Sequence, residues 1–445
     1  AKTPVLFSAA CPPAGTFNFS RLMQSGRVLD QVILLFMKGP NSSTGEDVLE
    51  IHCHGSRAVI DSIMACLDEA SGFRLAAPGE FTRRSFLNGK MDLSGVEGLA
   101  DLIDAQTPAQ LNQAWAQIDG ALRAPVMAWR AKLIEIVSQL EALIDFSDED
   151  LPSAIEQTLR KETMALINAL AESLSDCGVG ELVRDGVTVA MVGPVNAGKS
   201  TILNGLAGRD AAIVSNEAGT TRDVIQIQLD LFGVPTTILD TAGFRKTSGA
   251  IELEGIKRSV GAAANADLVM VVLDGSDKYW PVSRSKIDKI IDHEISQSSI
   301  NNNIIGGKKT NKRHRLYILN KADCGIVRAC SGNDCKDEQN NISNMLVISA
   351  KNPSDIKALN AALAERLVPL NYSEGSVIIT RQRHRQSIQS AHDALGRALT
   401  YDFKQTPELA AEDFRVAAVS LGRITGEIDV EDLLGLIFSS FCIGK

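Results

Sequence analysis

The segment Gly193-Pro-Val-Asn-Ala-Gly198-Lys199-Ser200 near the middle of the chain matches the pattern G-x-x-x-x-G-K-[ST]. Glycines in such a loop let backbone N–H groups surround phosphate oxygens, Lys199 can neutralise the β- and γ-phosphates, and Ser200 can bind Mg²⁺. The apolar run VTVAMVG precedes the loop and a helical pattern follows it, which is the order found in nucleotide-binding α/β units. A flexible glycine loop without a ligand is the weaker alternative.

Two further segments could serve a γ-phosphate and its metal ion. Gly219-Thr-Thr-Arg-Asp223 contains Thr221, whose hydroxyl can complete the Mg²⁺ shell in the triphosphate state. Asp240-Thr-Ala-Gly243 follows a predicted strand. Asp240 can therefore reach Mg²⁺ through water, and the amide of Gly243 can sense the γ-phosphate.

Two more segments could recognise the base. Asn320-Lys321-Ala322-Asp323 follows another predicted strand, and the Asp323 carboxylate can accept hydrogen bonds from N1–H and the 2-amino group of guanine, a pair that adenine lacks. Ser349-Ala350-Lys351 can supply a backbone contact to the guanine oxygen. All four segments occur in the order that a guanine-nucleotide switch protein requires, which predicts GTP binding with hydrolysis.

Hydrophobic patterning predicts the elements that position these residues. Strands are expected at 224–231, 236–239, 268–273, 317–319 and 345–348, separated by helical stretches, as in a doubly wound sheet. Residues 296–315 are rich in Asn, Ser and Lys and are expected to form an exposed insertion.

The flanking regions have a different character. Residues 28–54 alternate short β-like runs with a turn-rich segment, and a helical pattern follows to about residue 70, which predicts a small α+β unit. Residues 81–175 and the region from 377 onward are helical. The predicted fold class is an α/β P-loop GTPase domain inserted in an α-helical domain and preceded by a small α+β domain, with boundaries at 1–88, 89–183, 184–370 and 371–445.

Composition excludes several classes of protein. The 445 residues predict roughly three domains. With 45 basic and 54 acidic residues, the net charge of −9 argues against nonspecific coating of nucleic acid or anionic membrane. The longest aliphatic and aromatic run, Val32–Met37, is too short to cross a bilayer. Eight irregularly spaced cysteines without a signal segment indicate a reducing, cytoplasmic compartment, and the opening at Ala1 without Met suggests a missing start.

Several longer strings resemble one family. SNEAGTTRDV, the asparagine of NAGKS, TGEDVLEIHCHG, APGEFTRRSFLNGKMDL and the terminal FCIGK resemble the MnmE (TrmE) family of tRNA-modification GTPases, and the resemblance covers nearly all of the chain. It implies a homodimer with an N-terminal folate-binding domain, a helical domain and a GTPase domain inserted into the helical one. The family's opening strand and its Arg-Ile-Ser-Gly segment, a further folate contact, have no counterpart in this sequence.

The resemblance also implies how GTP would be hydrolysed. Phe244 stands where many switch proteins place a glutamine. A K⁺ ion held by Asn196 and by Ser215, Glu217 and Thr220 would take the place of an arginine finger, and Glu252 would orient the attacking water when two GTPase domains meet face to face. The alternatives are that Asn196 only caps the loop and that Glu252 is a surface residue. The residues predicted to contact the nucleotide or its ions are Asn196, Ala197, Gly198, Lys199, Ser200, Thr201, Ser215, Asn216, Glu217, Ala218, Gly219, Thr220, Thr221, Asp240, Thr241, Ala242, Gly243, Asn320, Lys321, Asp323, Ser349, Ala350 and Lys351.

The family transfers a one-carbon unit from a methylene-tetrahydrofolate to C5 of the wobble uridine of tRNA. The product is a carboxymethylaminomethyl or aminomethyl uridine. A flavoprotein partner, MnmG, carries FAD and forms a heterotetramer or larger complex with the family. By resemblance Glu50, Lys90 and Lys445 contact the folate, the alternative for Glu50 and Lys90 being an ordinary role in the fold. Cys442 is a candidate nucleophile or redox partner, and a structural thiol is an equal alternative.

Other reactive side chains carry weaker hypotheses. The spacing of Cys324, Cys330 and Cys335 is not typical of zinc sites, and His52, Cys53 and His54 belong to a family turn, so no metal is expected at either place. The basic run Lys308, Lys309, Lys312, Arg313, His314 and Arg315 is expected to be a solvated loop rather than a tRNA contact. Arg381, Arg383, His384 and Arg385 are better candidates for an RNA or partner surface.

Two rival functions remain open. One is a regulatory GTPase switch in RNA or ribosome assembly, which would need neither the Glu50 and Lys90 segment nor the terminal CIGK. The other is a chain that keeps GTPase activity but has lost folate function with the missing start.

Overall fold

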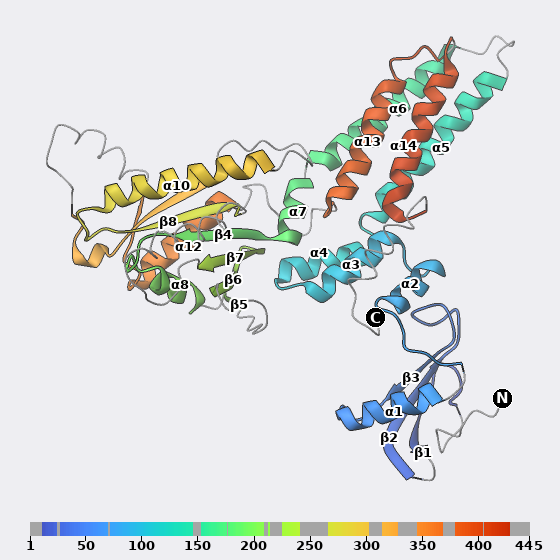
Figure 1. Cartoon of the computed structure of the whole chain (residues 1–445). Helices are drawn as coiled ribbons and strands as arrows, with labels where there is room; N and C mark the ends of the chain where they lie inside the picture. The colour runs from blue at the N-terminus through green and yellow to red at the C-terminus, as the bar shows by residue number, and fades with distance from the viewer. Residues whose placement is uncertain are drawn as a thin grey trace. The chain divides into compact units, whose positions relative to one another are not determined.

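The structure is a computed structural model that describes residues 11–24, 27–69, 72–145, 153–175, 177–208, 212–213, 225–240, 266–301, 314–327, 345–367, 379–403 and 405–427 (Figure 1). Two compact units divide the chain between them. The first contains 1–103, 114–172 and 383–445, and the second contains 104–113 and 173–382. The chain therefore leaves and re-enters each unit. None of the described helices is long and apolar enough to span a membrane.

The first unit begins with a three-stranded antiparallel sheet in the order β1-β2-β3, formed by β1 (Phe17–Gln24), β2 (Arg27–Met37) and β3 (Val48–His52). Helix α1 (Arg57–Glu69) supplies Ile63 and Cys66 to a core with Leu22, Val32 and Leu34. The sequence patterns do not predict β1, because Phe17 and Phe19 are 64% and 77% exposed, whereas the polar Ser20 is buried, which reverses the usual alternation of a half-buried strand.

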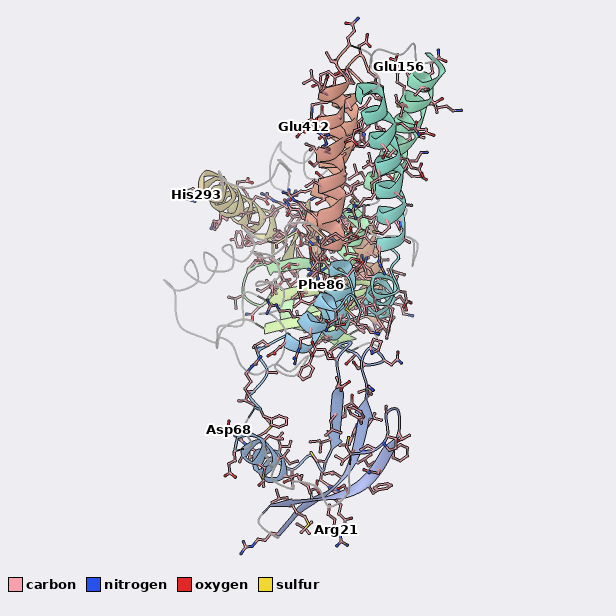
Figure 2. The ribbon with its side chains drawn as sticks, turned by 90° about the vertical axis from the view of Figure 1, so that its right-hand side faces the viewer. Arg21, Asp68, Phe86, Glu156, His293 and Glu412 are labelled. Atoms are coloured by element: carbon pink, nitrogen blue, oxygen red, sulfur yellow. The ribbon has the colours of Figure 1, made fainter. Side chains whose placement is uncertain are left out.

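Seven helices of the described residues make up the helical part of the chain outside the sheet of the second unit. They are α2 (Glu80–Leu87), α3 (Leu93–Asp104), α4 (Pro108–Ile118), α5 (Arg123–Asp145), α6 (Ser153–Ser175), α13 (Gln382–Ala398) and α14 (Pro407–Thr425). Phe86, labelled in Figure 2, packs with Leu93 and Val96. Helices α5 and α14 run antiparallel, because Glu141 near the end of α5 pairs with Arg415 within α14, whereas Arg130 near the start of α5 pairs with Glu427 just after α14.

A buried carboxylate joins helices that are nearly 300 residues apart in sequence. Glu97 on α3 accepts a hydrogen bond from Arg383 Nε at 2.6 Å, and its Oε2 lies 2.8 Å from His384 Nε2. Arg383 also donates to the backbone oxygens of Arg423 and Ile424 at the end of α14. The prediction that these two residues form an RNA or partner surface is therefore wrong. His384 is fully buried, and the Arg383 guanidinium binds Glu97 and the end of α14.

The second unit contains a seven-stranded mixed sheet in the order β10-β9-β8-β4-β7-β6-β5. The strands are β4 (Val187–Val192), β5 (Ala212–Ile213), β6 (Ile225–Leu231), β7 (Val234–Asp240), β8 (Leu268–Asp274), β9 (His314–Asn320) and β10 (Leu346–Val347). Strands β10, β9, β8, β4 and β7 are parallel to their neighbours in this order. Strand β6 is antiparallel to both β7 and β5. All five predicted strands are present.

Helices cover both faces of this sheet, as Figure 1 shows. Helices α8 (Lys199–Ala207) and α12 (Pro353–Leu367) pack on one face, where Ile202, Leu206 and Leu359 join the core of Val189, Met191 and Ile238. Helix α10 (Trp280–Asn301) packs on the other through Trp280, Ile287 and Ile291. Central strands made almost entirely of apolar residues, such as β4 and β8, are expected when both faces are covered.

Helix α7 (Cys177–Asp185) and the start of α4 also pack within the second unit. Thr107 Oγ1 donates to the backbone oxygen of Gly233 at 3.1 Å, and Gln110 Nε2 donates to that of Arg184 at 2.9 Å. Ala109 joins a core with Val183 and Val187. Residues 104–113 therefore belong to the α/β unit, although helical residues surround them in sequence.

The expected exposed loop at 296–315 is wrong at its two ends. Helix α10 continues to Asn301 and β9 begins at His314, so only 302–313 lie between them, outside the described residues. Arg315 is not part of a solvated loop, because its Nη1 lies 2.9 Å from Asp288 Oδ1 on α10. Lys308, Lys309, Lys312 and Arg313 of the basic run also lie outside the described residues.

The Glu97 cluster should stabilise the first unit strongly. Glu97→Gln should lower the free energy of unfolding by about 3 kcal/mol, because it leaves the Arg383 charge without its buried partner. The exposed Glu135, which pairs with Lys132 at 3.0 Å, is the matched control, and Glu135→Gln should cost less than about 1 kcal/mol. Urea unfolding followed by circular dichroism measures both, and equal effects would contradict the role given to Glu97.

The same cluster predicts a pH dependence. Burial alone would raise the pKa of the Glu97 carboxyl, but hydrogen bonds from His384 and Arg383 outweigh it and leave the pKa below the ordinary 4.5. Charged Glu97 therefore stabilises the folded chain fully above that ordinary value, and this stability is lost as the pH falls toward the folded-state pKa. The difference in unfolding free energy between the wild type and Glu97→Gln should shrink below about pH 4.5. A difference that stays constant to pH 3 would contradict this.

Candidate nucleotide-binding site

The glycine loop at 193–198 connects β4 to α8, as its pattern predicts. Its close approach to the sheet explains the first glycine, since a Cβ on Gly193 would lie 2.1 Å from the backbone oxygen of Val272 on β8. Gly198 has φ of +91° and Asn196 has φ of +65°, both in the left-handed region. These conformations turn the chain sharply into α8, whose first N–H groups form an anion-binding helix start.

Lys199 directly follows this loop as the first residue of α8. Its ammonium donates to the backbone oxygens of Gly193 and Pro194, each at 2.7 Å, and the residue is only 6% exposed. Ser200 and Thr201 follow on the first turn of α8 and are exposed. The cradle therefore combines backbone donors, one held lysine and two hydroxyls, a set that fits a polyphosphate and Mg²⁺.

Asn320 joins three of the predicted segments. It lies at the end of β9 and is 2% exposed. Its Nδ2 donates to the backbone oxygen of Ala197 in the glycine loop at 2.8 Å, and its Oδ1 accepts from the backbone N–H of Ala350 at 2.9 Å. A Cβ on Gly198 would lie 2.2 Å from this Nδ2, so the close approach requires glycine there.

Asp323 follows in the short 3₁₀ helix η1 (Ala322–Cys324) and is exposed. Its carboxylate accepts hydrogen bonds from Ser349 Oγ at 2.9 Å and Lys351 Nζ at 3.2 Å, and these bonds hold the pKa of the carboxyl below its usual range. Asp355, which the sequence patterns did not single out, accepts from the Ser349 N–H at 2.8 Å. The structure thus brings together the two segments predicted to read the base.

The remaining predicted nucleotide and ion residues are less fully described. Asp240 is the last residue of β7 and pairs with Ile225. The predicted residues outside the described part of the chain are Ser215, Asn216, Glu217, Ala218, Gly219, Thr220, Thr221, Thr241, Ala242, Gly243, Glu252, Cys442 and Lys445. Their roles stay predictions.

The predicted folate residues lie in the N-terminal part of the first unit. Glu50 on β3 is exposed, and its Oε2 lies 3.0 Å from His52 Nε2. Lys90 donates to the backbone oxygen of Pro40 at 2.8 Å. These interactions leave Glu50 and Lys90 on separate partners rather than on each other.

His52 and His54 each have a carboxylate partner. His54 lies with Nδ1 2.7 Å from Asp30 Oδ1, and its backbone N–H donates to the same carboxylate, which lowers the pKa of Asp30. Cys53 packs against the α1 core, and Cys324 is exposed. Within the described ranges no three His, Cys, Asp or Glu side chains are grouped to hold a metal.

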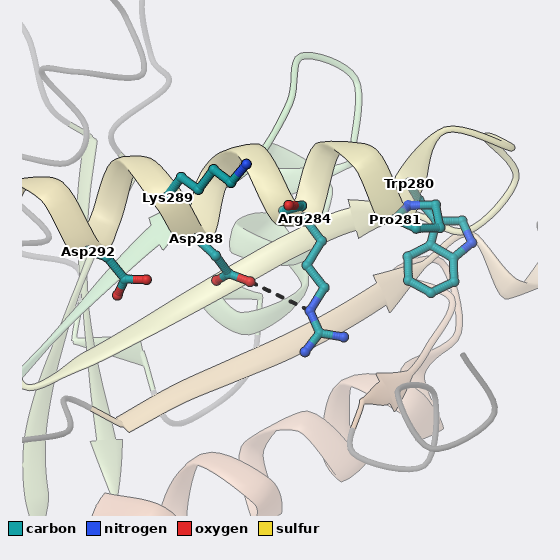
Figure 3. A pocket seen from close by; sticks show the side chains of 7 residues that line it. Trp280, Pro281, Arg284, Asp288, Lys289 and Asp292 are labelled. Carbon is teal, nitrogen blue, oxygen red and sulfur yellow. Dashed lines mark ion pairs between the residues drawn. The ribbon is translucent and has the colours of Figure 1, made fainter. Parts of the chain in front are cut away.

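A separate hollow of about 280 Å³ lies along α10 (Figure 3). Its acidic side chains already have partners: Asp288 pairs with Arg284 and Arg315, and Asp292 pairs with Arg315. None of the predicted site residues lines it. The hollow is lined by Trp280, Pro281, Arg284, Ser285, Asp288, Lys289 and Asp292.

The glycine cradle predicts a sharp effect of a single methyl group. Gly198→Ala should weaken binding of a fluorescent GDP at least tenfold and lower the free energy of unfolding by about 2 kcal/mol, because alanine is strained at positive φ and would collide with Asn320. Gly178→Ala is the control, since its Cβ meets open space. Unchanged GDP affinity in Gly198→Ala would show that the nucleotide does not depend on this cradle.

Comparisons with known proteins agree with this site. Residues 93–442 match the MnmE helical domain, and residues 5–90 match the GTP-binding protein TrmE N-terminus. The "tRNA modification GTPase MnmE" of Parvibaculum lavamentivorans is 45% identical over 418 residues, covering 94% of this chain and 87% of the relative. That of Paramagnetospirillum magneticum is 43% identical over 422 residues, covering 95% and 88%.

Among solved structures, Aquifex aeolicus Era bound to GDP and AlF4⁻ is 20% identical and covers 48% of this chain and 68% of its own, with a TM-score of 0.29 too low to bear on the assignment. The family models and the relatives are decisive without it, because both extend over most of the chain. The chain belongs to the MnmE family.

Proposed function

We propose that the chain is a GTPase of tRNA modification. The observation that carries this proposal is the Asn320 carboxamide, which bonds to both Ala197 and Ala350 and so assembles a phosphate-binding loop and a base-reading loop into one site. The identity of 45% to a tRNA modification GTPase over most of both chains supports the same function.

In this proposal different groups of the chain bind the base and the phosphates of the nucleotide. The exposed Asp323 carboxylate accepts from N1–H and the 2-amino group of guanine, and Lys199 neutralises the β- and γ-phosphates. The Lys351 ammonium pairs with the Asp323 carboxylate at 3.2 Å, so guanine binding would break an exposed and weakly held ion pair. Binding would therefore exchange one set of hydrogen bonds for another at modest cost.

Two ions would complete the GTPase site. Ser200 and Thr221 would hold Mg²⁺, which supplies charge to neutralise the phosphates. Asn196, Ser215, Glu217 and Thr220 would hold K⁺, which supplies positive charge in the place of an arginine finger. The exposed side chain and left-handed backbone of Asn196 are compatible with this role. Glu252 would hold the attacking water, in a homodimer whose GTPase domains meet.

The potassium proposal has a direct test. GTP turnover should be much faster in KCl than in NaCl at equal ionic strength, and Glu252→Ala should abolish turnover while a fluorescent GDP still binds. A malachite-green phosphate assay measures turnover. Equal rates in the two salts would contradict the K⁺ site, and retained turnover in the variant would move the water-orienting role elsewhere.

We further propose that the N-terminal part binds a tetrahydrofolate derivative. The exposed carboxylate of Glu50 and the exposed ammonium of Lys90 offer an acceptor and a cation suited to a pterin and its glutamate tail. With the FAD-containing MnmG partner, the chain would install a carboxymethylaminomethyl or aminomethyl group on the wobble uridine. The rival function, a regulatory switch in RNA or ribosome assembly, needs no such residues.

Analysis of tRNA separates these two functions. Mass spectrometry of wobble uridines from cells lacking this gene should show loss of the modified base, and a copy carrying Glu50→Gln should fail to restore it. A copy carrying Asp61→Asn, an exposed acidic residue on α1 paired with Arg57 at 3.8 Å, should restore it. Unchanged modification in the deletion strain would favour the regulatory switch.

A further inference from the structure

One carboxylate at the edge of the nucleotide site has no role in the site as described so far. Asp274 is the last residue of β8 and lies opposite Asn320 in the parallel pairing with β9. Its Oδ2 accepts a hydrogen bond from Lys321 Nζ at 2.6 Å. Its Oδ1 accepts from the backbone N–H of Ser276 at 3.0 Å and from Ser276 Oγ at 2.6 Å. One carboxylate oxygen therefore accepts hydrogen bonds from the turn after β8, and the other accepts one from Lys321.

Backbone hydrogen bonds fix the position of Asp274 relative to the base-reading loop. The N–H of Gly275 donates to the backbone oxygen of Asn320 at 2.8 Å, and the N–H of Val327 donates to that of Gly275 at 2.9 Å. A Cβ on Gly275 would lie 2.9 Å from the Asn320 oxygen, so no larger residue allows the same approach. The turn at 274–276 and the loop at 320–327 are thus held together on both sides of Lys321.

Lys321 itself is unusually constrained for a lysine. Its backbone is in the left-handed region, with φ of +65°, and its side chain is one-third exposed. Hydrogen bonds from Lys321 and Ser276 outweigh the effect of burial and hold the pKa of Asp274 below its usual range, so this partner stays charged. A lysine side chain normally samples many rotamers, and a charged partner at its tip removes most of that freedom.

The position of Lys321 gives this restraint a functional meaning. Lys321 lies between Asn320, which bonds to the glycine loop, and Asp323, which we propose binds the base. A lysine already held in place at this point does not lose its rotamer freedom when a nucleotide binds, and such preorganisation raises affinity.

We propose that Asp274 is a positioning residue for guanine-nucleotide binding, which holds the Lys321 side chain in its binding conformation before the nucleotide arrives. This inference rests on the proposed GTP-binding function. It assigns to Asp274 an effect on nucleotide affinity that acts through Lys321 rather than through contact with the ligand.

The test measures the affinity of the full chain for mant-GDP by fluorescence titration. Asp274→Asn should weaken binding by about tenfold, the size expected for ordering one lysine side chain. Two controls should bind as the wild type does. Asp277→Asn removes an exposed carboxylate in the same turn that accepts from the Tyr279 N–H at 3.0 Å. Ser276→Ala removes the hydroxyl that donates to Asp274 but leaves the hydrogen bonds of Asp274 with the backbone N–H of residue 276 and with Lys321.

A double-mutant cycle separates positioning from a purely structural role. Lys321→Ala should also weaken binding, and the double variant of Asp274→Asn and Lys321→Ala should bind no more weakly than Lys321→Ala alone. Effects that add, wild-type affinity in Asp274→Asn, or weakened binding in Ser276→Ala would each overturn the proposal. Failure of the wild type to bind mant-GDP would instead overturn the proposed function.

Discussion

A single buried carboxamide, that of Asn320, holds the phosphate-binding and base-reading parts of the site in register. Its amide nitrogen reaches Ala197 in the loop after β4, and its oxygen reaches the N–H of Ala350 after β10. Because both groups of the side chain are satisfied and the residue is buried, replacing it would leave two backbone groups of different loops without partners. The same carboxamide leaves no room for a Cβ at Gly198, so the glycine of the loop and the asparagine of β9 depend on each other.

The sheet beneath the site is covered by helices on both faces. The central strands β4 and β8 are almost wholly buried, and β9 continues their parallel order to the point where Asn320 emerges. Asp274, Asn320 and the glycine loop therefore all lie at the carboxyl ends of adjacent strands, where ligands of α/β sheets bind. A separate interaction stabilises the first unit. Glu97 binds Arg383 and His384, so residues that precede and follow the seven-stranded sheet in sequence meet in one buried ion cluster.

The parts that sequence predicted well are those with local signals. The glycine loop, the five strands and the helices flanking them follow from periodicity and from motifs only a few residues long. Sequence patterns place Arg383 and His384 on an RNA or partner surface, because their actual partner, Glu97, is 286 and 287 positions away and no local pattern connects them. Sequence patterns do not predict strand β1, because Phe17 and Phe19 lie on its exposed face while Ser20 is buried. Asp274 and Asp355 belong to no motif, and their roles arise only from the hydrogen bonds that the folded loops bring about.

The central claim is that Asp323 reads a guanine base in this site, and its nucleotide specificity tests that claim most directly. Asparagine keeps the size of the side chain but replaces one acceptor oxygen with a donor, which suits the 2-oxo group of xanthine in place of the 2-amino group of guanine. Affinities of the wild type and of Asp323→Asn for GDP and XDP should be measured side by side. The account predicts that the variant loses at least tenfold in GDP affinity and gains affinity for XDP. An Asp323→Asn chain that binds GDP as tightly as the wild type would contradict it.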